Sequence, residues 1–445
     1  MRGSVERERG WGVGLTSSLL LLRWIDGSII ILSYYYLQPF GLLGLAISLL
    51  VSSLLLLTYP PLMRWIEKNQ QGFWFLTEQE RLRNRQTSKG KRGSLLFLSL
   101  FSSGWLLLFH SWLIAGILVL VLQLPIWTAY LLLLLLVLFI NLFLSEGRRV
   151  RLIPWELFIL FLSSILLPLF FFVRHGVEPV YQGIRLYHPY MLVLNHKAMW
   201  LAVLTAAIVQ WAIYWIDGTT WYWMQKQYDG KRSKTYLAAG FLQVSLGLPL
   251  LAILAIFLYP GSYNGMDWWY HAMQSLFPNP LFWQVLIAAL MIMLISSFAF
   301  ELFTFKTMLS LALWEGRDQK QRRADSTHWV FIVAYALLLL GLFSWRPSPF
   351  TLFYLYQGFA VAVLPPLFIL LKGGSAIKGL WLGAGVAFLW GMFHWYQGGS
   401  VITSLWQILL LSMAWSVGTW IFKGLKGRIS KQIHSNSEHS IQKPV

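Results

Sequence analysis

Long runs of apolar residues, separated by short polar segments, dominate the chain from Val13 to Phe422. A run of about 20 apolar residues is long enough to cross the hydrocarbon core of a bilayer as a helix. A β-barrel would instead show short segments of alternating hydrophobicity, and these are not seen. The pattern predicts an all-α polytopic membrane protein with about twelve transmembrane helices, over residues 12–37, 39–63, 93–122, 125–145, 154–174, 198–224, 234–259, 281–313, 327–345, 350–371, 375–395 and 401–422.

The distribution of basic residues indicates the orientation of these helices in the membrane. Eight Lys and Arg residues lie between Arg64 and Arg92, and further basic clusters follow the fourth, sixth, eighth, tenth and twelfth spans. The opposite segments hold only Arg174, Arg185, Lys197 and Arg346. Cytoplasmic loops of membrane proteins carry an excess of Lys and Arg. We therefore expect a multi-pass protein of the cell membrane with its N- and C-termini in the cytoplasm.

Composition supports the same class. Hydrophobic residues make up 57% of the chain and charged residues 12%, about half the share in soluble domains, which is roughly 25%. The net charge of +18 is explained by topology, so we expect the lipid bilayer and not nucleic acid as a partner. The absence of cysteine excludes thiolate metal sites, and no Walker A or HExxH motif is present. We expect one transmembrane domain over 1–429 and a disordered tail over 430–445.

Two similar pentamers interrupt the first and sixth spans. Residues 24–28 read Trp-Ile-Asp-Gly-Ser, and residues 215–219 read Trp-Ile-Asp-Gly-Thr. Asp-Gly followed by a hydroxyl residue favours a break in a helix, and broken helices free backbone groups that bind ions and solutes. A solute or coupling site is therefore predicted at Gly27, Tyr214, Trp215, Asp217, Gly218 and Thr219. In the alternative interpretation, each Asp lies near a helix end and Arg23 neutralises Asp26.

The eighth span carries further polar residues. Ser297 and Glu301 are four residues apart and share a face, and hydroxyl and carboxylate oxygens suit a hard cation such as Na⁺. Alternatively, Ser296 and Ser297 are small residues that let helices pack closely. Lys306 is five residues from Glu301 and does not share its face. The aromatic residues of the sixth span line a cavity or form an interface belt: Trp211, Tyr214, Trp215, Trp221, Tyr222 and Trp223.

Several segments, in order, resemble the sodium:solute symporter family. The segment Thr77–Arg85 with Arg92 is similar to the family's cytoplasmic T-x-x-E-x-L-x-x-R segment. The Ser296-Ser297 helix, and Leu364-Pro365-Pro366 followed by Gly379–Gly383, are similar to its eighth-span and late Gly-rich regions. The resemblance covers about residues 35–420.

The resemblance implies the leucine-transporter fold. Its two inverted five-helix repeats would cover about 12–174 and 198–371, with two extra helices at about 375–422. In the family, Na⁺ is held by paired hydroxyls and by carbonyls of the broken first helix, which correspond to Ser296, Ser297 and the backbone from Trp24 to Asp26. The expected function is secondary active transport by alternating access, with Na⁺- or H⁺-coupled symport of a small organic solute, Glu301 contributing to coupling, and no enzymatic activity.

Two other functions stay open on sequence grounds. A relative that no longer transports would act as a sensor or partner subunit through the basic segment 64–93. A membrane-embedded enzyme would need a metal or an acid–base pair near the surface, and one segment expected outside holds His175, Glu178, His188 and His196. Their spacing matches no common metal motif, so a solvated loop is the simpler explanation.

Overall fold

The computed structural model describes residues 12–24, 28–61, 89–143, 146–193, 197–224, 232–261, 268–276, 280–313, 324–371 and 378–441. These residues form helices joined by turns. The helices of the first half are α1 (Val13–Trp24), α2 (Ser28–Leu55), η1 (Leu56–Thr58), α5 (Lys89–Leu122), α6 (Ile126–Phe143), α7 (Glu146–His175), α8 (Glu178–Tyr187) and η2 (Pro189–Leu192). Those of the second half are α9 (Lys197–Ile216), α10 (Gly218–Met224), α11 (Arg232–Leu258), α12 (Trp268–Leu276), α13 (Pro280–Leu313), α14 (Ala324–Trp345), α15 (Pro349–Leu371), α16 (Lys378–Tyr396) and α17 (Val401–Ile441).

The prediction of an all-helical, multi-pass membrane protein is confirmed. Eight helical segments in the part of the chain that the structure describes are long and apolar enough to cross a bilayer, and three shorter apolar helices accompany them, at 13–23, 126–141 and 330–345. These three correspond to the expected first, fourth and ninth spans. The total of twelve spans stays a prediction.

Helix α2 contains the end of the first expected span and most of the second, and its two helical parts are joined by a non-helical kink at Gly41. Gly41 has φ of 61°, in the region that favours glycine, and a Cβ there would lie 2.9 Å from the carbonyl oxygen of Met191. Pro39 precedes it and removes a backbone donor from the same turn. The chain therefore bends at Gly41, where it packs closely against η2.

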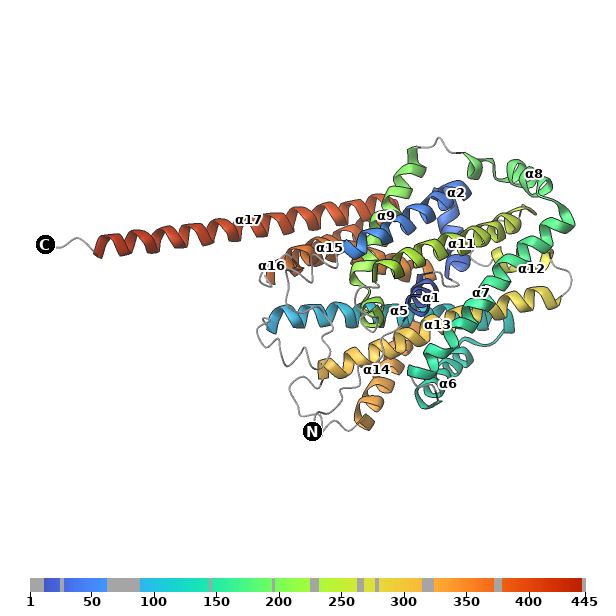
Figure 1. The fold of residues 1–445 in the computed structure, drawn as a ribbon, viewed down its shortest axis with the longest axis horizontal. Helices are drawn as coiled ribbons and strands as arrows, with labels where there is room; N and C mark the ends of the chain where they lie inside the picture. Colours follow the sequence, from blue (N-terminus) through green and yellow to red (C-terminus); the bar gives the residue numbers. More distant parts are fainter. Residues whose placement is uncertain are drawn as a thin grey trace.

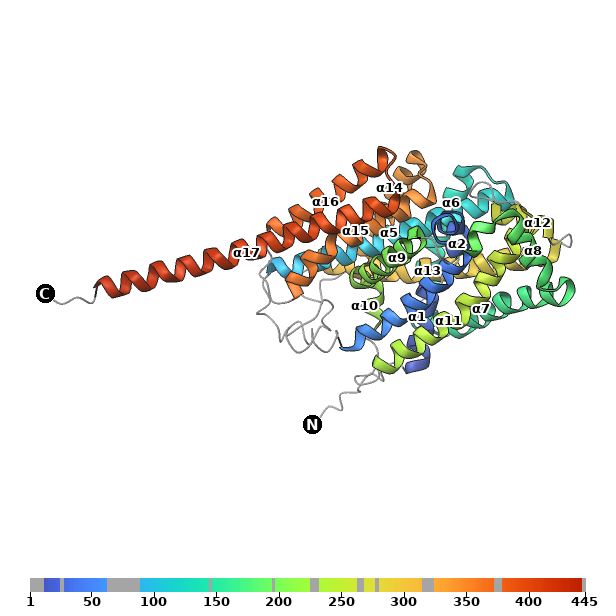
Figure 2. The same cartoon turned by 90° about the horizontal axis from the view of Figure 1, so that it is seen from above.

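The helices form an elongated bundle with two distinct ends (Figure 1 and Figure 2). The short helices α8 and α12 lie at one end, and α17 projects from the other. Helix α17 extends to Ile441, beyond the apolar part of the span expected at 401–422. The disordered tail expected over 430–445 stays a prediction.

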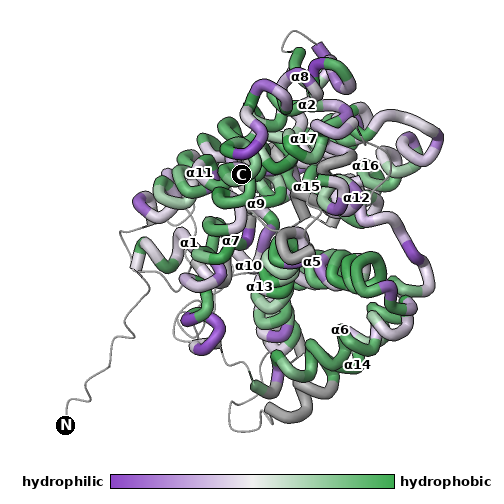
Figure 3. Tube along the Cα trace, turned by 90° about the vertical axis from the view of Figure 1, so that its right-hand side faces the viewer, coloured by the Kyte–Doolittle hydropathy of each residue, from purple (hydrophilic) through white to green (hydrophobic). Residues whose placement is uncertain are grey.

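The helix at the core of the bundle is α13. In its apolar window 72% of the residues are buried, compared with 28% in α7 and 28% in the C-terminal α17. Large apolar side chains cover the outer helices, among them Phe139, Trp155 and Leu337, each more than half exposed. Seen along the bundle, most of the helical trace is hydrophobic (Figure 3). Such a surface is covered by lipid, and polar residues on α13 therefore lie far from it.

Candidate functional site

The sixth expected span is broken at Asp217. Helix α9 ends at Ile216 and α10 begins at Gly218. The Asp217 carboxylate caps α10, because its Oδ1 accepts the backbone N–H of Thr219 at 3.1 Å and its Oδ2 accepts the Thr220 hydroxyl at 2.5 Å. Asp is one of the preferred residues at this position, where it satisfies donors that the helix leaves unpaired. The Asp-Gly-Thr sequence thus interrupts the helix in the way the pentamer predicts.

Gly218 lets α10 approach α5 closely. A Cβ at this position would lie 2.7 Å from the Cβ and 2.9 Å from the Cα of Ser99 on α5. Any larger residue would push the two backbones apart. Gly218, the glycine of the second pentamer, therefore allows the helix break to pack directly against α5.

Arg23, in the last turn of α1, joins the break to α13. Its Nη2 lies 3.3 Å from Asp217 Oδ1 and also contacts Glu301 Oε1. The Thr219 hydroxyl donates to Glu301 Oε2 at 2.6 Å. The exposed fractions of the three charged residues are 6% for Arg23, 1% for Asp217 and 0% for Glu301. We call Arg23, Asp217 and Glu301 the charged triad.

The triad differs from the local ion pair considered from the sequence. That alternative paired Arg23 with Asp26, three residues away. Asp26 and Gly27 lie outside the described residues, as does the side chain of Trp24, whose backbone ends α1. The described partners of Arg23 come from residues about 190 and 280 positions further along the chain. Such long-range pairing carries no local sequence signal.

The two adjacent serines of α13 face different partners. The Ser297 hydroxyl donates to the Leu22 carbonyl oxygen of α1 at 3.2 Å. The Ser296 hydroxyl donates to Glu156 Oε2 at 2.7 Å and also contacts Arg149 Nη2. The structure brings Ser297 beside the first helix, next to a carbonyl of the kind implied for Na⁺ binding. The Ser296 hydroxyl faces α7 instead of α1.

Arg149 and Glu156 form a second buried ion pair, which sequence reasoning missed. The Arg149 guanidinium binds the Glu156 carboxylate through two hydrogen bonds, at 2.6 and 2.8 Å, and lies 4.3 Å from the centre of the Phe300 ring. The charge pattern assigns Arg149 to the basic cluster that follows the fourth span and is expected in the cytoplasm. A signal was available, because two opposite charges seven residues apart in an apolar run lie on one helix face. The pair links α7 to α13.

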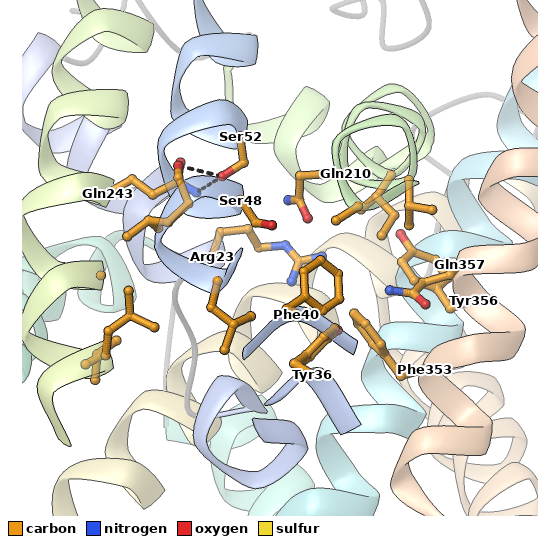
Figure 4. Close-up of a pocket in the computed structure, with 18 of the residues that line it drawn as sticks. Arg23, Tyr36, Phe40, Ser48, Ser52, Gln210, Gln243, Phe353, Tyr356 and Gln357 are labelled. Carbon is orange, nitrogen blue, oxygen red and sulfur yellow. Dashed lines mark hydrogen bonds between the residues drawn. The ribbon is translucent and has the colours of Figure 1, made fainter. Parts of the chain in front are cut away.

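A cavity of about 240 Å³ reaches the triad, and both Arg23 and Asp217 line it (Figure 4). Its other polar lining residues carry amides and hydroxyls, and they include Ser48, Ser52, Gln210, Gln243 and Gln357. Its aromatic lining residues are Tyr36, Phe40, Phe109, Phe353 and Tyr356. Apolar walls with a few placed hydrogen-bonding groups are typical of small-molecule sites. The amides were not predicted from the sequence.

A second cavity, of about 460 Å³, adjoins the first. The two share Tyr36, Phe40, Ala206, Val209 and Gln357 as lining residues. The second cavity reaches Gln38 and Ser400, which are both exposed; Gln38 lies near the kink in α2 and Ser400 in the turn before α17. Both turns belong to segments that the charge distribution assigns to the outside. Because the two cavities share lining residues, we interpret them as a route from that surface to Arg23 and Asp217.

An aromatic cluster packs next to the helix break at Asp217. The Tyr59 ring lies 5.6 Å from those of Tyr214 and Trp215 and 5.2 Å from that of Tyr236, measured between centroids. All four side chains are almost fully buried, and none lines either cavity. Tyr214 and Trp215 were predicted to line a cavity or to form an interface belt, and in the structure they pack inside the bundle. The side chains of Trp221 and Tyr222 lie outside the described residues.

Other candidate residues have simpler surroundings. Lys306 donates to Asn141 Oδ1 at 3.3 Å and is not paired with Glu301, in agreement with their spacing. Thr304 accepts the indole N–H of Trp223 at 3.2 Å. Within the described ranges, no group of three or more His, Asp or Glu side chains comes together to hold a metal ion. His196, one of the residues considered for a metal site, lies outside those ranges.

No protein-family model and no curated protein sequence matches the chain. Its structure is similar to that of a Na⁺-coupled sialic acid symporter in a substrate-bound outward-open state, with a TM-score of 0.60, 12% identity, and coverage of 91% of this chain and 88% of that one. It is also similar to the nucleobase-cation-symport-1 family transporter Mhp1 in a closed conformation with bromovinylhydantoin bound, with a TM-score of 0.52, 10% identity and 94% coverage of each chain. The chain therefore has the leucine-transporter fold of these transporters.

Proposed function

We propose that this chain is a secondary transporter that moves a small organic solute across the cell membrane in symport with a cation, Na⁺ or H⁺. The observation that carries the proposal is the cavity that ends on Arg23 and Asp217, at a break in a helix deep within the bundle. Broken helices of this kind form the solute and ion sites of many secondary transporters. Similarity in fold to two solute–cation symporters supports the same class.

The cavity chemistry favours an uncharged solute. Its charged lining residues, Arg23 and Asp217, already bind each other at 3.3 Å. An ionic solute would have to compete with that buried pair. Amide side chains offer both donors and acceptors, and aromatic rings cover an apolar face. We therefore propose a compact solute with hydrogen-bonding groups on one side and an apolar face on the other.

The arrangement also supports alternating access. The route of cavities leads to the surface predicted outside. Tyr59, Tyr214, Trp215 and Tyr236 pack together beside the helix break and do not line the route. In the sequence, Tyr59 and Tyr236 lie close to the segments 62–88 and 225–231, whose basic residues predict the cytoplasmic side. Transport requires that the aromatic cluster open when the outer route closes. Coupling requires only that solute and ion favour the same state.

The proposal is tested first by ligand-dependent thermal unfolding of the purified chain in detergent, followed by uptake into proteoliposomes. A solute that binds the native state raises its unfolding temperature by mass action. Ala206→Trp, which fills the junction of the two cavities, should abolish both the shift and the uptake. Leu337→Trp, on the lipid-facing surface, is the matched control and should leave both unchanged.

The coupling ion is assigned in the same assay by titrating Na⁺ against K⁺ or choline at equal ionic strength. A Na⁺-specific shift that Ser297→Ala abolishes would assign Na⁺ to the carbonyl and hydroxyl beside α1. A chain that binds solutes but carries none through the membrane would contradict transport. That result would favour the alternative of a sensor or partner subunit.

A further inference from the structure

Two adjacent serines of α13, Ser296 and Ser297, are the positions at which the family resemblance implies a bound Na⁺. A hard cation of this kind needs several oxygen lone pairs that converge on one point. Both serines are buried, so their hydroxyls have neighbours from the bundle and not from bulk water. The partners of each hydroxyl therefore show whether its oxygen is available to an ion.

The Ser296 oxygen accepts a hydrogen bond from a cationic side chain. Arg149 Nη2 donates to Ser296 Oγ, and the Ser296 hydroxyl in turn donates to Glu156 Oε2 at 2.7 Å. A guanidinium has five N–H donors and no acceptor, and it is not deprotonated in proteins. Repulsion between like charges in a low-dielectric interior opposes a Na⁺ ion beside it. The donor set at Ser296 does not fit Na⁺.

The Ser297 hydroxyl points to a different helix. It donates to the Leu22 carbonyl oxygen on α1 at 3.2 Å. Successive residues of an α-helix are rotated by about 100° around its axis, since one turn takes about 3.6 residues. Ser297 accordingly faces α1, whereas Ser296 faces α7. The two hydroxyls do not converge on one ion.

The surroundings of Arg149 match the shape and the charge of a guanidinium. The Glu156 carboxylate binds it through two hydrogen bonds, at 2.6 and 2.8 Å, and its Cζ lies 4.3 Å from the centre of the Phe300 ring. The exposed fraction of Arg149 is only 1%. Bidentate pairing with a carboxylate and contact with an aromatic face suit a planar guanidinium. The cation at this position is therefore part of the chain.

The same cation is connected to the helix break. Helix α7, which carries Arg149, packs against both α1 and α13. The Phe300 ring that Arg149 contacts packs edge-on against the Trp223 ring of α10, with the two centroids 5.3 Å apart. The Trp223 indole also donates to Thr304 of α13 at 3.2 Å. Arg149 thus holds α7 against α13 beside the second half of the broken helix.

The guanidinium is separate from the solute route. Neither Arg149 nor Ser296 lines either of the two cavities, whereas Arg23 and Asp217 line the first. A cation on a side chain stays in place whatever the ion concentrations on the two sides of the membrane. It therefore supports the contacts of α7 with α13 equally well with and without Na⁺.

We propose that the Arg149 guanidinium takes the place of Na⁺ at Ser296, and that solute transport by this chain does not depend on Na⁺. The inference rests on the proposed function, and of the two cations considered there it removes Na⁺. Arg149 is a positioning residue, because it contacts α13 and not the cavity where a solute would bind.

Thermal unfolding of the purified full chain in detergent tests the inference without a known solute. NaCl is titrated against KCl and choline chloride at equal ionic strength. The wild type should show no Na⁺-specific rise in unfolding temperature, because Arg149 supplies the cation. Arg149→Ala should unfold at a lower temperature and should gain a rise with Na⁺ or with a low concentration of guanidinium, since a small cation can then pair with Glu156.

Three further variants separate the charge of Arg149 from the rest of its side chain. Arg149→Lys keeps the positive charge and should not respond to Na⁺, and it gives the comparison if the alanine variant does not fold. Arg148→Ala, at the exposed neighbouring position, should behave as the wild type. Adding Glu156→Gln to Arg149→Ala should remove the gained response, because the anion is then absent.

Two results would overturn the inference. One is a Na⁺-specific rise in the unfolding temperature of the wild type or of Arg149→Lys. The other is a folded Arg149→Ala protein that neither Na⁺ nor guanidinium stabilises.

Uptake by proteoliposomes separates this inference from the proposed function. Equal rates in Na⁺, K⁺ and choline media would support both the inference and transport. Uptake by the wild type that requires Na⁺ would keep the transporter and overturn the replacement of Na⁺ by Arg149. A chain that carries none of the solutes it binds, but whose Arg149→Ala variant gains the cation response, would keep the guanidinium at Ser296 and overturn the proposed function.

Discussion

Arg23 is the residue on which three helical elements converge. It is almost fully buried, at 6% exposure, and contacts carboxylates from the α9–α10 break and from α13. A buried charge is stabilised by its partners more than by its own packing. Removing the partner therefore costs more than the pair contributes, because the remaining charges lose their compensation.

Arg23→Met should accordingly destabilise the protein strongly, by about 3–5 kcal/mol, because two carboxylates lose their cation. Adding Glu301→Gln and Asp217→Asn to this variant should recover part of the loss, since no uncompensated charge then remains. Thermal unfolding in detergent gives both comparisons. Arg174→Met, at an exposed position near the end of α7, is the control and should change the unfolding temperature little. Equal effects at Arg23 and Arg174 would contradict the energetic role of the triad.

Local chemistry explains which residues of the site could be predicted. Asp217, Gly218 and Thr219 reveal a helix break because capping and backbone freedom depend on neighbouring residues. Glu301 and Ser297 were placed on one face by their spacing, and both contact α1. The contacts of Arg23 with Asp217 and Glu301 were not predictable in this way, because these residues are distant from Arg23 in sequence and near it only in the fold. The contact between Arg149 and Ser296 was not predictable either, because these two residues are also distant in sequence.

At the scale of elements, close helix approach depends on particular glycines. Helix α10 follows the break and meets α5 at Gly218, where no space exists for a Cβ. The kink within α2 at Gly41 meets η2 in a similar way. The apolar pattern predicted the bounds of α5, α6, α11, α13, α14 and α15 to within a few residues, but it did not predict η2 or the bounds of α2. It did not predict which glycines make close helix contacts, because a glycine in an apolar run does not by itself indicate a contact with another helix.

Gly218→Ala should separate α10 from α5 and destabilise the bundle by about 1–3 kcal/mol, the usual cost of overpacking. It should also weaken solute binding, since Asp217 would move with the helix end. The control is Gly116→Ala on α5, where a Cβ meets no atom within 4 Å. That change should be neutral or slightly stabilising, because alanine favours helix over glycine. The measurement is the unfolding temperature of each variant and its shift on adding solute. If Gly218→Ala and Gly116→Ala had similar unfolding temperatures and similar shifts, the close approach at Gly218 would be contradicted.

At the scale of the whole molecule, the cavities and the aromatic cluster divide the bundle into an accessible side and a packed side. Gln38 and Ser400 lie at the exposed mouth, and Ala206 lies where the cavities join. The orientation expected from basic residues makes this mouth external. Sidedness is thus a property of the whole chain that no single motif determines.

Cysteine accessibility tests this division directly, because the chain contains no cysteine. In intact cells, Gln38→Cys and Ala206→Cys should react with a membrane-impermeant thiol reagent added outside, and a bound solute should slow only the reaction at Ala206. Ala299→Cys, buried on α13, should stay unreactive. Reaction at Gln38 without reaction at Ala206 would show that the route is closed. Reaction at both only in inside-out vesicles would reverse the orientation.

The length of α17 has a mechanical consequence. Three hydrogen bonds join its first part to neighbouring helices: Trp406 binds Thr205 of α9, Ser412 binds Ala362 of α15, and Trp415 binds Gly379 of α16. From Trp415 to Ile441 the helix extends roughly 40 Å further, at about 1.5 Å per residue. Each degree of tilt at the anchored part displaces the far end by about 0.7 Å. The projecting arm is therefore a lever, and a distance probe near its tip would magnify small rotations of the helices that enclose the cavity.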